Sequence, residues 1–271
     1  MLSLQHIDLC VEGSIAFAYL QRPHTANALN EELWYELEEL ANWAQRTSSI
    51  RVVVLSAHGQ HFCSGIDFTL LQSISSSFSK LPPGAKQEWL FEKIQRLQKA
   101  ITAFEDCSKP VIAAIDGACI GGGIDLICAC DLRYATKSAQ FCVKEIDLAI
   151  VADIGTIQRL PRIVGEGVAR ELAYTARTVG AQEAHSIRLL NNVFEDRHTL
   201  LEEVRKIANT IASKSPLTVR NTKKSFLYSR DHTVGEGLEH VARMNSAILF
   251  SDDAQEAILA MMQKRSPHYQ D

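Results

Sequence analysis

Four carboxylates lie in two segments that otherwise consist largely of small or apolar residues. The first segment, residues 117–126 (GACIGGGIDL), contains Asp125, and the second, residues 143–153 (VKEIDLAIVAD), contains Glu145, Asp147 and Asp153. Carboxylates that converge on one apolar cavity acquire different pKa values, so one can be protonated while another is ionised. Such a set could remove a proton from one carbon and deliver a proton to another.

Each acid also has an ordinary structural explanation. Asp125 falls in the first turn of a predicted helix, where the helix dipole favours a negative charge. Asp153 could cap a helix that begins in DIGTIQRLPR, and Asp147, the remaining acid of the second segment, could face solvent. The residues alone leave both interpretations open.

Glycines mark two loops that follow apolar runs. The GGG at 121–123 leaves free N–H groups at the start of a helix and lets a ligand approach the backbone. It lacks the lysine of a P-loop and fits the dinucleotide fingerprint poorly. FCSGID, residues 62–67, is a second loop of this kind. Two loops at one sheet edge could each offer an N–H to one carbonyl oxygen, forming an oxyanion hole. Close packing of strand and helix is the alternative explanation for the glycines.

The elements that must position these loops alternate between strands and helices, which predicts an α/β fold. Strands are predicted at 5–11, 14–20, 51–57, 110–117 and 191–195 and in LRYAT and QFCV. Helices are predicted at about 31–46, 85–106, 153–176, 181–189, 199–214, 217–229, 233–250 and 253–264, and a buried helix is predicted to begin at GGGIDLICACD. The Ser- and Pro-rich stretch 73–84 is predicted to be the most mobile segment.

Composition argues against several classes of function. The 271 residues carry a net charge of -4, so no basic excess points to nucleic acid. The seven cysteines include no CxxC and no zinc-ligand pattern, which predicts reduced thiols and no metal site. No apolar run reaches the length of a membrane span, and no signal peptide or SKL-type ending is seen. These absences predict a cytoplasmic protein.

Taken in order, the motifs resemble the crotonase (enoyl-CoA hydratase/isomerase) superfamily over nearly the whole chain. The resemblance is carried by RPHTANALN, FCSGIDF, KPVIAAIDGACIGGGIDLICACDLRYAT, AQFCVKEIDLAIVADIGTIQRLPRIVG and SDDAQEAILAMMQKRSPHY. It implies a crotonase-type spiral of ββα units over residues 1–198, which hold the acyl-CoA site. It also implies that residues 199–271 form a helical region that assembles homotrimers or homohexamers.

The resemblance further implies a branch of the superfamily. Enoyl-CoA hydratases have glutamates at the positions of Asp125 and Glu145, and a small residue, usually glycine, eight places after the second. This chain has Asp153 at that last position. The trio is similar to that of the Δ3,5-Δ2,4-dienoyl-CoA isomerases of fatty-acid β-oxidation.

The resemblance also implies roles for the acids and for two backbone amides. The N–H groups of Ile66 and Gly122 would bind the thioester carbonyl and stabilise an enolate. Glu145 would remove a proton from C2, Asp153 would deliver one to C6, and Asp125 would orient Glu145 or tune its pKa. No metal or other cofactor is implied, because the amides stabilise the enolate and coenzyme A is part of the substrate.

Coenzyme A is expected beside Ala26, Ala28 and Ser64. Many relatives have basic residues just before the NAL of the first loop, whereas this chain has HTA at 24–26, so the contact from that loop is expected to be weaker or to be supplied from elsewhere. Lys264 matches a lysine that in relatives reaches coenzyme A from a neighbouring subunit. A solvated lysine at a helix end is the alternative.

Competing functions stay open at this point. An enoyl-CoA hydratase or a Δ3,Δ2-enoyl-CoA isomerase would use the same fold. A non-catalytic member that binds coenzyme A or RNA would be surprising, because it has no use for three acids in a pocket and the chain shows no basic stripe. The sequence does not indicate the acyl chain length.

Overall fold

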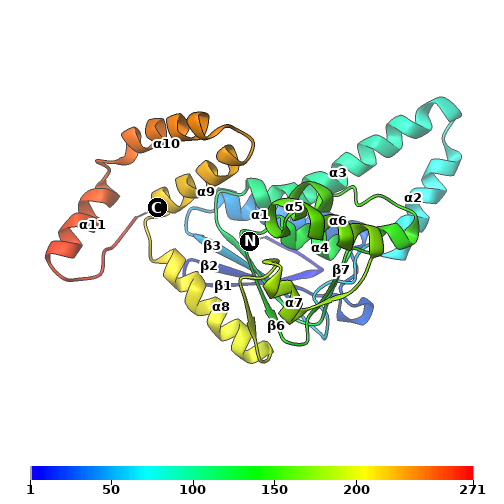
Figure 1. The fold of residues 1–271 in the computed structure, drawn as a ribbon, viewed down its shortest axis with the longest axis horizontal. Helices are drawn as coiled ribbons and strands as arrows, with labels where there is room; N and C mark the ends of the chain where they lie inside the picture. The colour runs from blue at the N-terminus through cyan, green and yellow to red at the C-terminus, as the bar shows by residue number, and fades with distance from the viewer. Residues whose placement is uncertain (1, 271) are drawn as a thin grey trace.

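Two sheets organise the part of the chain that the structure, a computed structural model, describes, which is residues 2–270 (Figure 1). The larger sheet has the order β1-β2-β3-β4-β6-β9. Its strands are β1 (Ile7–Glu12), β2 (Ile15–Leu20), β3 (Val52–Ala57), β4 (Val111–Ile115), β6 (Leu132–Thr136) and β9 (Asn192–Phe194). All neighbours pair in parallel except the β1–β2 hairpin. The smaller sheet contains β5 (Ala118–Ile120), β7 (Gln140–Cys142) and β8 (Val179–Gly180).

Helices cover both faces of the larger sheet. The helices of the described residues are α1 (Glu31–Arg46), α2 (Phe68–Lys80), α3 (Lys86–Asp106), α4 (Gly122–Cys128), α5 (Thr156–Val164), α6 (Glu166–Thr175), α7 (Ala181–Ser186), α8 (Arg197–Ala212), α9 (Pro216–Arg230), α10 (Val234–Ile248) and α11 (Asp252–Met262), and not all of them contact this sheet. Along β3, Val53 and Leu55 join an apolar cluster with α1, α3 and α4. Val52 and Val54 point to the other face and join a cluster with α8. Because both faces of β3 are covered, the whole strand is buried and Ser56 is its one polar residue.

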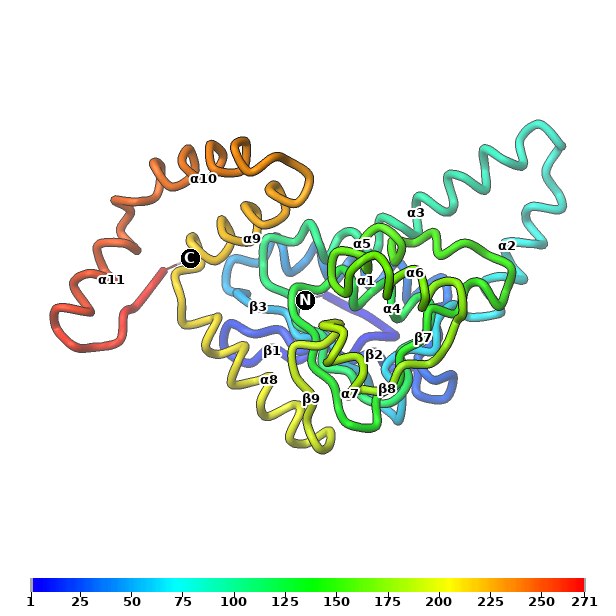
Figure 2. The backbone as a smooth tube through the Cα atoms, in the orientation of Figure 1, coloured from blue at the N-terminus to red at the C-terminus, as the bar shows by residue number. Residues whose placement is uncertain are grey.

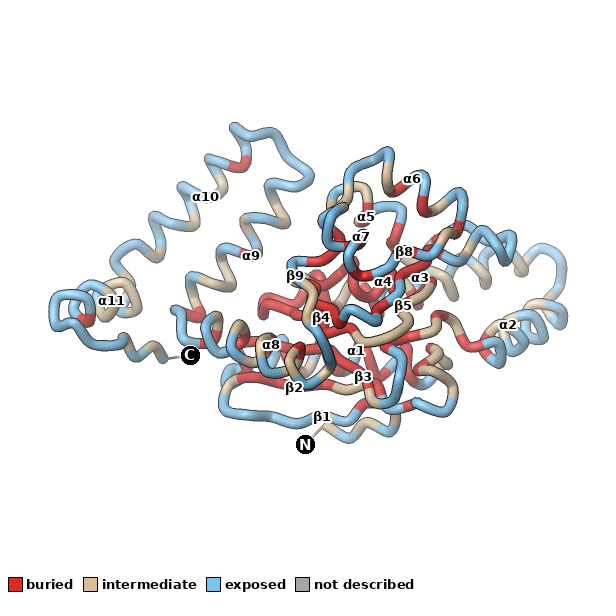
Figure 3. Tube along the Cα trace, turned by 60° about the horizontal axis from the view of Figure 1, so that its bottom comes forward, coloured by how far each residue is buried: buried red, intermediate tan, exposed pale blue. Residues whose placement is uncertain are grey.

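The C-terminal helices divide into a packed and a projecting part. Helix α8 lies on the sheet, whereas α9, α10 and α11 extend to one side of it and the α2–α3 hairpin extends to the other (Figure 2). Figure 3 shows that buried residues gather around the sheet and are sparse along α10 and α11. The division of the chain at residue 198 stays a prediction, but the projecting helices begin only at Pro216.

Most predicted elements are present within two or three residues of their expected bounds. No helix was predicted at 73–84, yet its first part belongs to α2, and the mobility predicted for this segment stays a prediction. Leu70, Ile74 and Phe78 recur at helical spacing there and give the serine-rich helix an apolar stripe. Strands β5 and β8 were not predicted. Among residues 2–270, no helix has both the length and the apolar character needed to cross a bilayer.

Candidate active site

The two glycine-marked loops lie against each other at the carboxyl ends of β3 and β4. Cys63, in the first loop, forms a parallel bridge with Cys119 of β5. The Cys63 N–H donates to the carbonyl of Ala118 (3.0 Å), and the N–H of Ile120 donates to the Cys63 carbonyl (2.9 Å). Neighbouring parallel strands end at the same edge of a sheet, so the loops that follow them meet there.

Gly65 and Gly122 lie close to each other where the two loops meet. Gly65 has φ of +97°, and a Cβ added to it would lie 3.1 Å from the carbonyl oxygen of Ile120 and 3.6 Å from the nitrogen of Gly122. Within the described chain, the N–H groups of Ile66 and Gly122 donate no hydrogen bond. Gly122 is the first residue of α4, at the positive end of the helix dipole. Two unpaired amides on adjoining loops are what an oxyanion hole requires.

Glu145 lies beside this pair of loops. It begins the 3-10 turn η3 (Glu145–Leu148), and a Cβ added to Gly121 would lie 3.3 Å from its Oε1. Its Oε2 is one of three buried side-chain polar atoms in residues 2–270 that have no hydrogen-bond partner. Burial raises the pKa of Glu145, and the charge of Asp153 raises it further. The backbone N–H groups of Glu145 and Lys144 lower the pKa but do not cancel this effect. An unpaired carboxylate oxygen of raised pKa is suited to accept a proton.

Asp125 is the most deeply buried of the three acids. Its Oδ1 accepts hydrogen bonds from the backbone N–H (2.7 Å) and from Oγ1 (2.6 Å) of Thr156. Burial raises the pKa of Asp125 to about 7, with further increases from the charges of Glu145 and Asp153, while the Thr156 hydrogen bonds oppose the shift. Both the protonated and the ionised form of this carboxyl group are therefore accessible near neutral pH.

Asp153 does not cap a helix, so that structural explanation is wrong. Helix α5 begins at Thr156 with Gly155 at the N-cap position, and Asp153 lies in the loop before it. The backbone carbonyl of Asp153 accepts a hydrogen bond from Nε2 of Gln98 (2.6 Å). Burial raises the pKa of the Asp153 carboxyl, which favours its protonated form.

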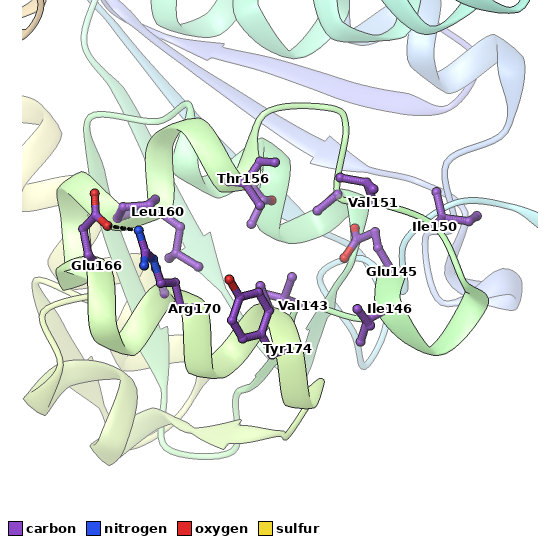
Figure 4. A pocket seen from close by; sticks show the side chains of 15 residues that line it. Val143, Glu145, Ile146, Ile150, Val151, Thr156, Leu160, Glu166, Arg170 and Tyr174 are labelled. Atoms are coloured by element: carbon purple, nitrogen blue, oxygen red, sulfur yellow. Dashed lines mark hydrogen bonds and ion pairs between the residues drawn. The ribbon is translucent and has the colours of Figure 1, made fainter.

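An apolar cavity of about 400 Å³ opens beside Glu145 (Figure 4). It is lined from η3, α5 and α6 and the segments around them, chiefly by Val143, Ile146, Ile150, Val151, Ala152, Ile157, Leu160, Pro161, Ala169, Ala173 and Tyr174. Thr156 also lines it, and an ion pair between Glu166 and Arg170 (2.6 Å) closes one end.

The three acids interact through their charges but do not line a single cavity. Asp153 borders a second, polar cavity of about 390 Å³ that is also lined by Gln98, Thr102 and Arg159. Asp125 is 1% exposed and lies behind Thr156. The three acids therefore influence one another's pKa values without sharing one cavity. Residues 150–156 border both the apolar cavity and the polar cavity.

Three of the four residues expected to contact coenzyme A lie together. The N–H of Ser64 donates to the carbonyl of Ala26 (3.0 Å), and the Ala28 carbonyl, two residues along the same loop, accepts from the guanidinium of Arg22. Lys264 follows α11 in the projecting part of the chain and is exposed. Its contact with coenzyme A from a neighbouring subunit stays a prediction.

Two features of the site were not predicted from the sequence. One is Thr156, which binds Asp125 from 31 residues away along the chain. The other is the buried ion pair between Arg22 Nη1 and Asp67 Oδ2 (2.9 Å), which joins the first loop to the loop of Ile66. Capping preference could have identified Asp67, because an aspartate precedes the apolar run that becomes α2.

Comparison with known proteins agrees with this geometry. A family model described as "Enoyl-CoA hydratase/isomerase" matches residues 11–271. The peroxisomal Delta(3,5)-Delta(2,4)-dienoyl-CoA isomerase of Arabidopsis thaliana is 47% identical over 268 residues, which cover 98% of this chain and 96% of the relative. The mitochondrial Delta(3,5)-Delta(2,4)-dienoyl-CoA isomerase of Rattus norvegicus is 43% identical over 91% of this chain and 76% of its own length. The crystal structure of an enoyl-CoA hydratase from Bacillus anthracis superposes with a TM-score of 0.88 at 31% identity, over 98% of this chain and 99% of that one.

Proposed function

The chain belongs to the enoyl-CoA hydratase/isomerase family, and from this premise we propose that it converts 3,5-dienoyl-CoA into 2,4-dienoyl-CoA, a step of fatty-acid β-oxidation. The observation that carries the proposal is the trio of electrostatically coupled acids, Asp125, Glu145 and Asp153, in a chain 47% identical to a named dienoyl-CoA isomerase. A hydratase with two acids and a small third residue would not need Asp153.

In the first step, Glu145 removes a proton from C2. This proton is acidic because C2 lies between the thioester carbonyl and the C3–C4 double bond. As the C–H bond breaks, its electron pair moves into the conjugated system and negative charge develops on the thioester oxygen. The N–H groups of Ile66 and Gly122 are the donors proposed for that oxygen, and their lack of other acceptors supports the assignment.

In the second step, Asp153 delivers a proton to C6. The charge of the trienolate is shared along the chain to C6, and protonation there leaves double bonds at C2–C3 and C4–C5. The substrate has lost one proton and gained one, Glu145 holds an added proton, and Asp153 has given one up. Exchange with solvent then restores both groups. The raised pKa of Asp153 supports its protonated starting state.

We propose no metal or separate cofactor for this chemistry, because backbone amides carry the developing charge and coenzyme A enters as part of the substrate. Ala26, Ala28 and Ser64 are proposed to contact the coenzyme A moiety, and Lys264 is proposed to reach it from a neighbouring subunit. The hydrogen bond between Ser64 and Ala26, with Ala28 two residues along the same loop, supports a common binding edge.

The test is a spectrophotometric assay of the purified protein. A 3,5-dienoyl-CoA should give the ultraviolet absorbance of the conjugated 2,4-dienoyl thioester, while a 2-enoyl-CoA in a parallel cuvette should show little hydration. Glu145→Gln and Asp153→Asn should each lower kcat at least a hundredfold, the lower range for loss of a general acid or base. Asp147→Asn is the matched control, since Asp147 lies in the same 3-10 turn and pairs with Lys144 at the surface. Full activity in Asp153→Asn, or rapid hydration without diene formation, would refute the proposal.

We also propose that the chain assembles as a homotrimer or homohexamer through its C-terminal helices. Support comes from large apolar side chains that are exposed on and around α9, α10 and α11. They are Phe226, Val234, Leu238, Val241, Leu249, Phe250, Ile258, Leu259, Met261 and Met262. Monomeric proteins rarely expose so many large apolar side chains in neighbouring elements.

The compartment stays a prediction. The sequence analysis predicted the cytoplasm from missing signals, whereas the names of two relatives give peroxisomes and mitochondria. Imaging of the tagged full chain in its source cells distinguishes the three.

A further inference from the structure

We propose that Thr156 is a positioning residue for the isomerisation, which holds the buried carboxyl group of Asp125 through one oxygen and thereby controls its protonation. The inference rests on the proposed function and adds to it a residue that acts through Asp125 and not on the substrate.

The contact is a two-donor clamp on a single oxygen. Thr156 is fully buried and is the first residue of α5. Its backbone N–H and its Oγ1 both donate to Oδ1 of Asp125, at 2.7 and 2.6 Å. The free N–H groups at the start of a helix carry the positive end of its dipole, so α5 itself favours a negative charge at this point.

The other groups around Asp125 give it no compensating charge. Glu145 on η3 and Asp153 before α5 both disfavour its ionised form. The charge of Asp125 reaches the thiols of Cys63, Cys119 and Cys128, and burial raises their own pKa values, so they stay neutral. Within residues 2–270, Thr156 is the only residue that donates hydrogen bonds to the Asp125 side chain, and no lysine, arginine or histidine pairs with it.

The clamp has a chemical consequence. Both donors use lone pairs of Oδ1, so a proton held by Asp125 resides on Oδ2. The hydroxyl favours the ionised carboxyl and so lowers its pKa against the effect of burial. Without this hydroxyl, Asp125 keeps only the backbone N–H of Thr156 as a donor and stays protonated to higher pH, so it no longer presents the same charge to Glu145 at neutral pH.

Two substitutions separate the hydroxyl from the shape of the side chain. Thr156→Val keeps the branched shape and the backbone N–H but removes Oγ1, and Thr156→Ser restores a hydroxyl. In Thr156→Val the loss of one hydrogen bond to a charged group should raise the pKa of Asp125 by about one unit and lower kcat about tenfold, with KM little changed. Thr156→Ser should return both values close to those of the unmodified protein.

The titration is measured without substrate, by carboxyl ¹³C NMR of aspartate-labelled protein from about pH 4 to about pH 9, a range that brackets the ordinary and shifted pKa values. Asp125→Asn identifies the signal. An Asp125 titration that is the same in Thr156→Val and in the unmodified protein would overturn the inference, as would a kcat loss that Thr156→Ser does not rescue. If Thr156→Val does not fold, Thr156→Ala removes the same hydroxyl with less bulk. An unmodified protein that fails to isomerise the diene would refute the proposed function, while the NMR titration would still decide the role of the clamp.

Discussion

The buried carboxyl group of Asp125 lowers the free energy of unfolding by an amount that depends on pH. Its ordinary pKa of 3.8 is raised to about 7 in the folded chain, chiefly by burial. Between these two values the folded state binds more protons at this site than the unfolded state. The free energy of unfolding therefore falls as pH rises from about 4 to about 7, and the loss is complete above that range. A group that is useful for catalysis at neutral pH thus weakens the fold at the same pH.

Asp125→Asn tests this cost. Asparagine keeps a carbonyl oxygen for the two Thr156 donors but has no charge to bury. We expect the variant to be more stable than the unmodified protein at about pH 8, by a few kcal/mol at most, since one pKa unit corresponds to about 1.4 kcal/mol. At about pH 4 the difference should be small.

Urea denaturation at the two pH values measures the effect, with Asp147→Asn as the exposed control. A stability difference for Asp125→Asn that does not change with pH would contradict the expectation. The same variant should have a lower kcat, so that stability and activity move in opposite directions.

The sequence allowed the three acids to be identified but not the contact that holds the deepest of them. Asp125, Glu145 and Asp153 stand out because charged residues are unusual inside apolar segments. Thr156 does not stand out, since a hydroxyl at the start of a helix is common. Its importance arises from a hydrogen bond across 31 residues, and no local pattern encodes such a contact.

At the scale of elements, local patterns predicted the structure wherever an element is stabilised by its own composition. Strands β3 and β4 are wholly buried and, apart from Ser56, apolar, and α1 has a regular apolar face, so the predicted bounds of these elements were close. Strands β5 and β8 have three and two residues, and they exist because neighbouring strands offer backbone partners. Helix α2 was missed because serine and proline outweighed the spacing of its apolar residues.

Asp67 connects helix α2 to the loop that contains Arg22, so it should contribute more to the free energy of unfolding than an ordinary helix cap. Its Oδ1 caps α2 through the N–H of Thr69 (2.9 Å), and its Oδ2 pairs with the buried guanidinium of Arg22. Removal of this carboxylate in Asp67→Ala would leave Arg22 buried without its partner. We expect a loss of about 3 kcal/mol or more in the free energy of unfolding, and a lower kcat because Ile66 is its neighbour.

Asp196→Ala is the matched control, because Asp196 caps α8 through the N–H of Thr199 (2.8 Å) at an exposed site. It should cost about 1 kcal/mol and leave kcat unchanged. Urea denaturation and the diene assay on both variants measure the contrast. Equal losses of stability in the two variants would mean that Asp67 serves only as a cap.

At the scale of the whole molecule, the buried Lys223 connects the projecting helices to the core through hydrogen bonds. Lys223 of α9 donates to the carbonyls of Phe104 (3.2 Å) and Lys109 (3.1 Å) and to Oδ2 of Asp131 (2.8 Å). Beyond α9 the chain leaves the core, and many of its large apolar side chains are exposed. These side chains contribute little to the stability of a single chain, which supports the proposed assembly of copies.

Phe250→Glu tests whether copies meet at this surface. Phe250 is 84% exposed, so a charge there should not disturb the fold of one chain. A phenylalanine buried between subunits contributes about 2 kcal/mol or more, and a buried unpaired glutamate opposes association further. We therefore expect the mass measured by light scattering to fall toward that of one chain, while the circular dichroism stays unchanged. Val11→Glu, an exposed site on β1, should keep the assembled mass.

Assembly and catalysis are linked through Lys264 if that residue reaches coenzyme A from a neighbouring subunit. Dissociation would then raise KM for the acyl-CoA, because a positive charge near the phosphates is lost. The first chemical step would keep its base, since Glu145 and its loops belong to one chain. A Phe250→Glu protein that dissociates with an unchanged KM would place the coenzyme A contacts within the single chain. An unchanged mass would show that copies do not meet at Phe250.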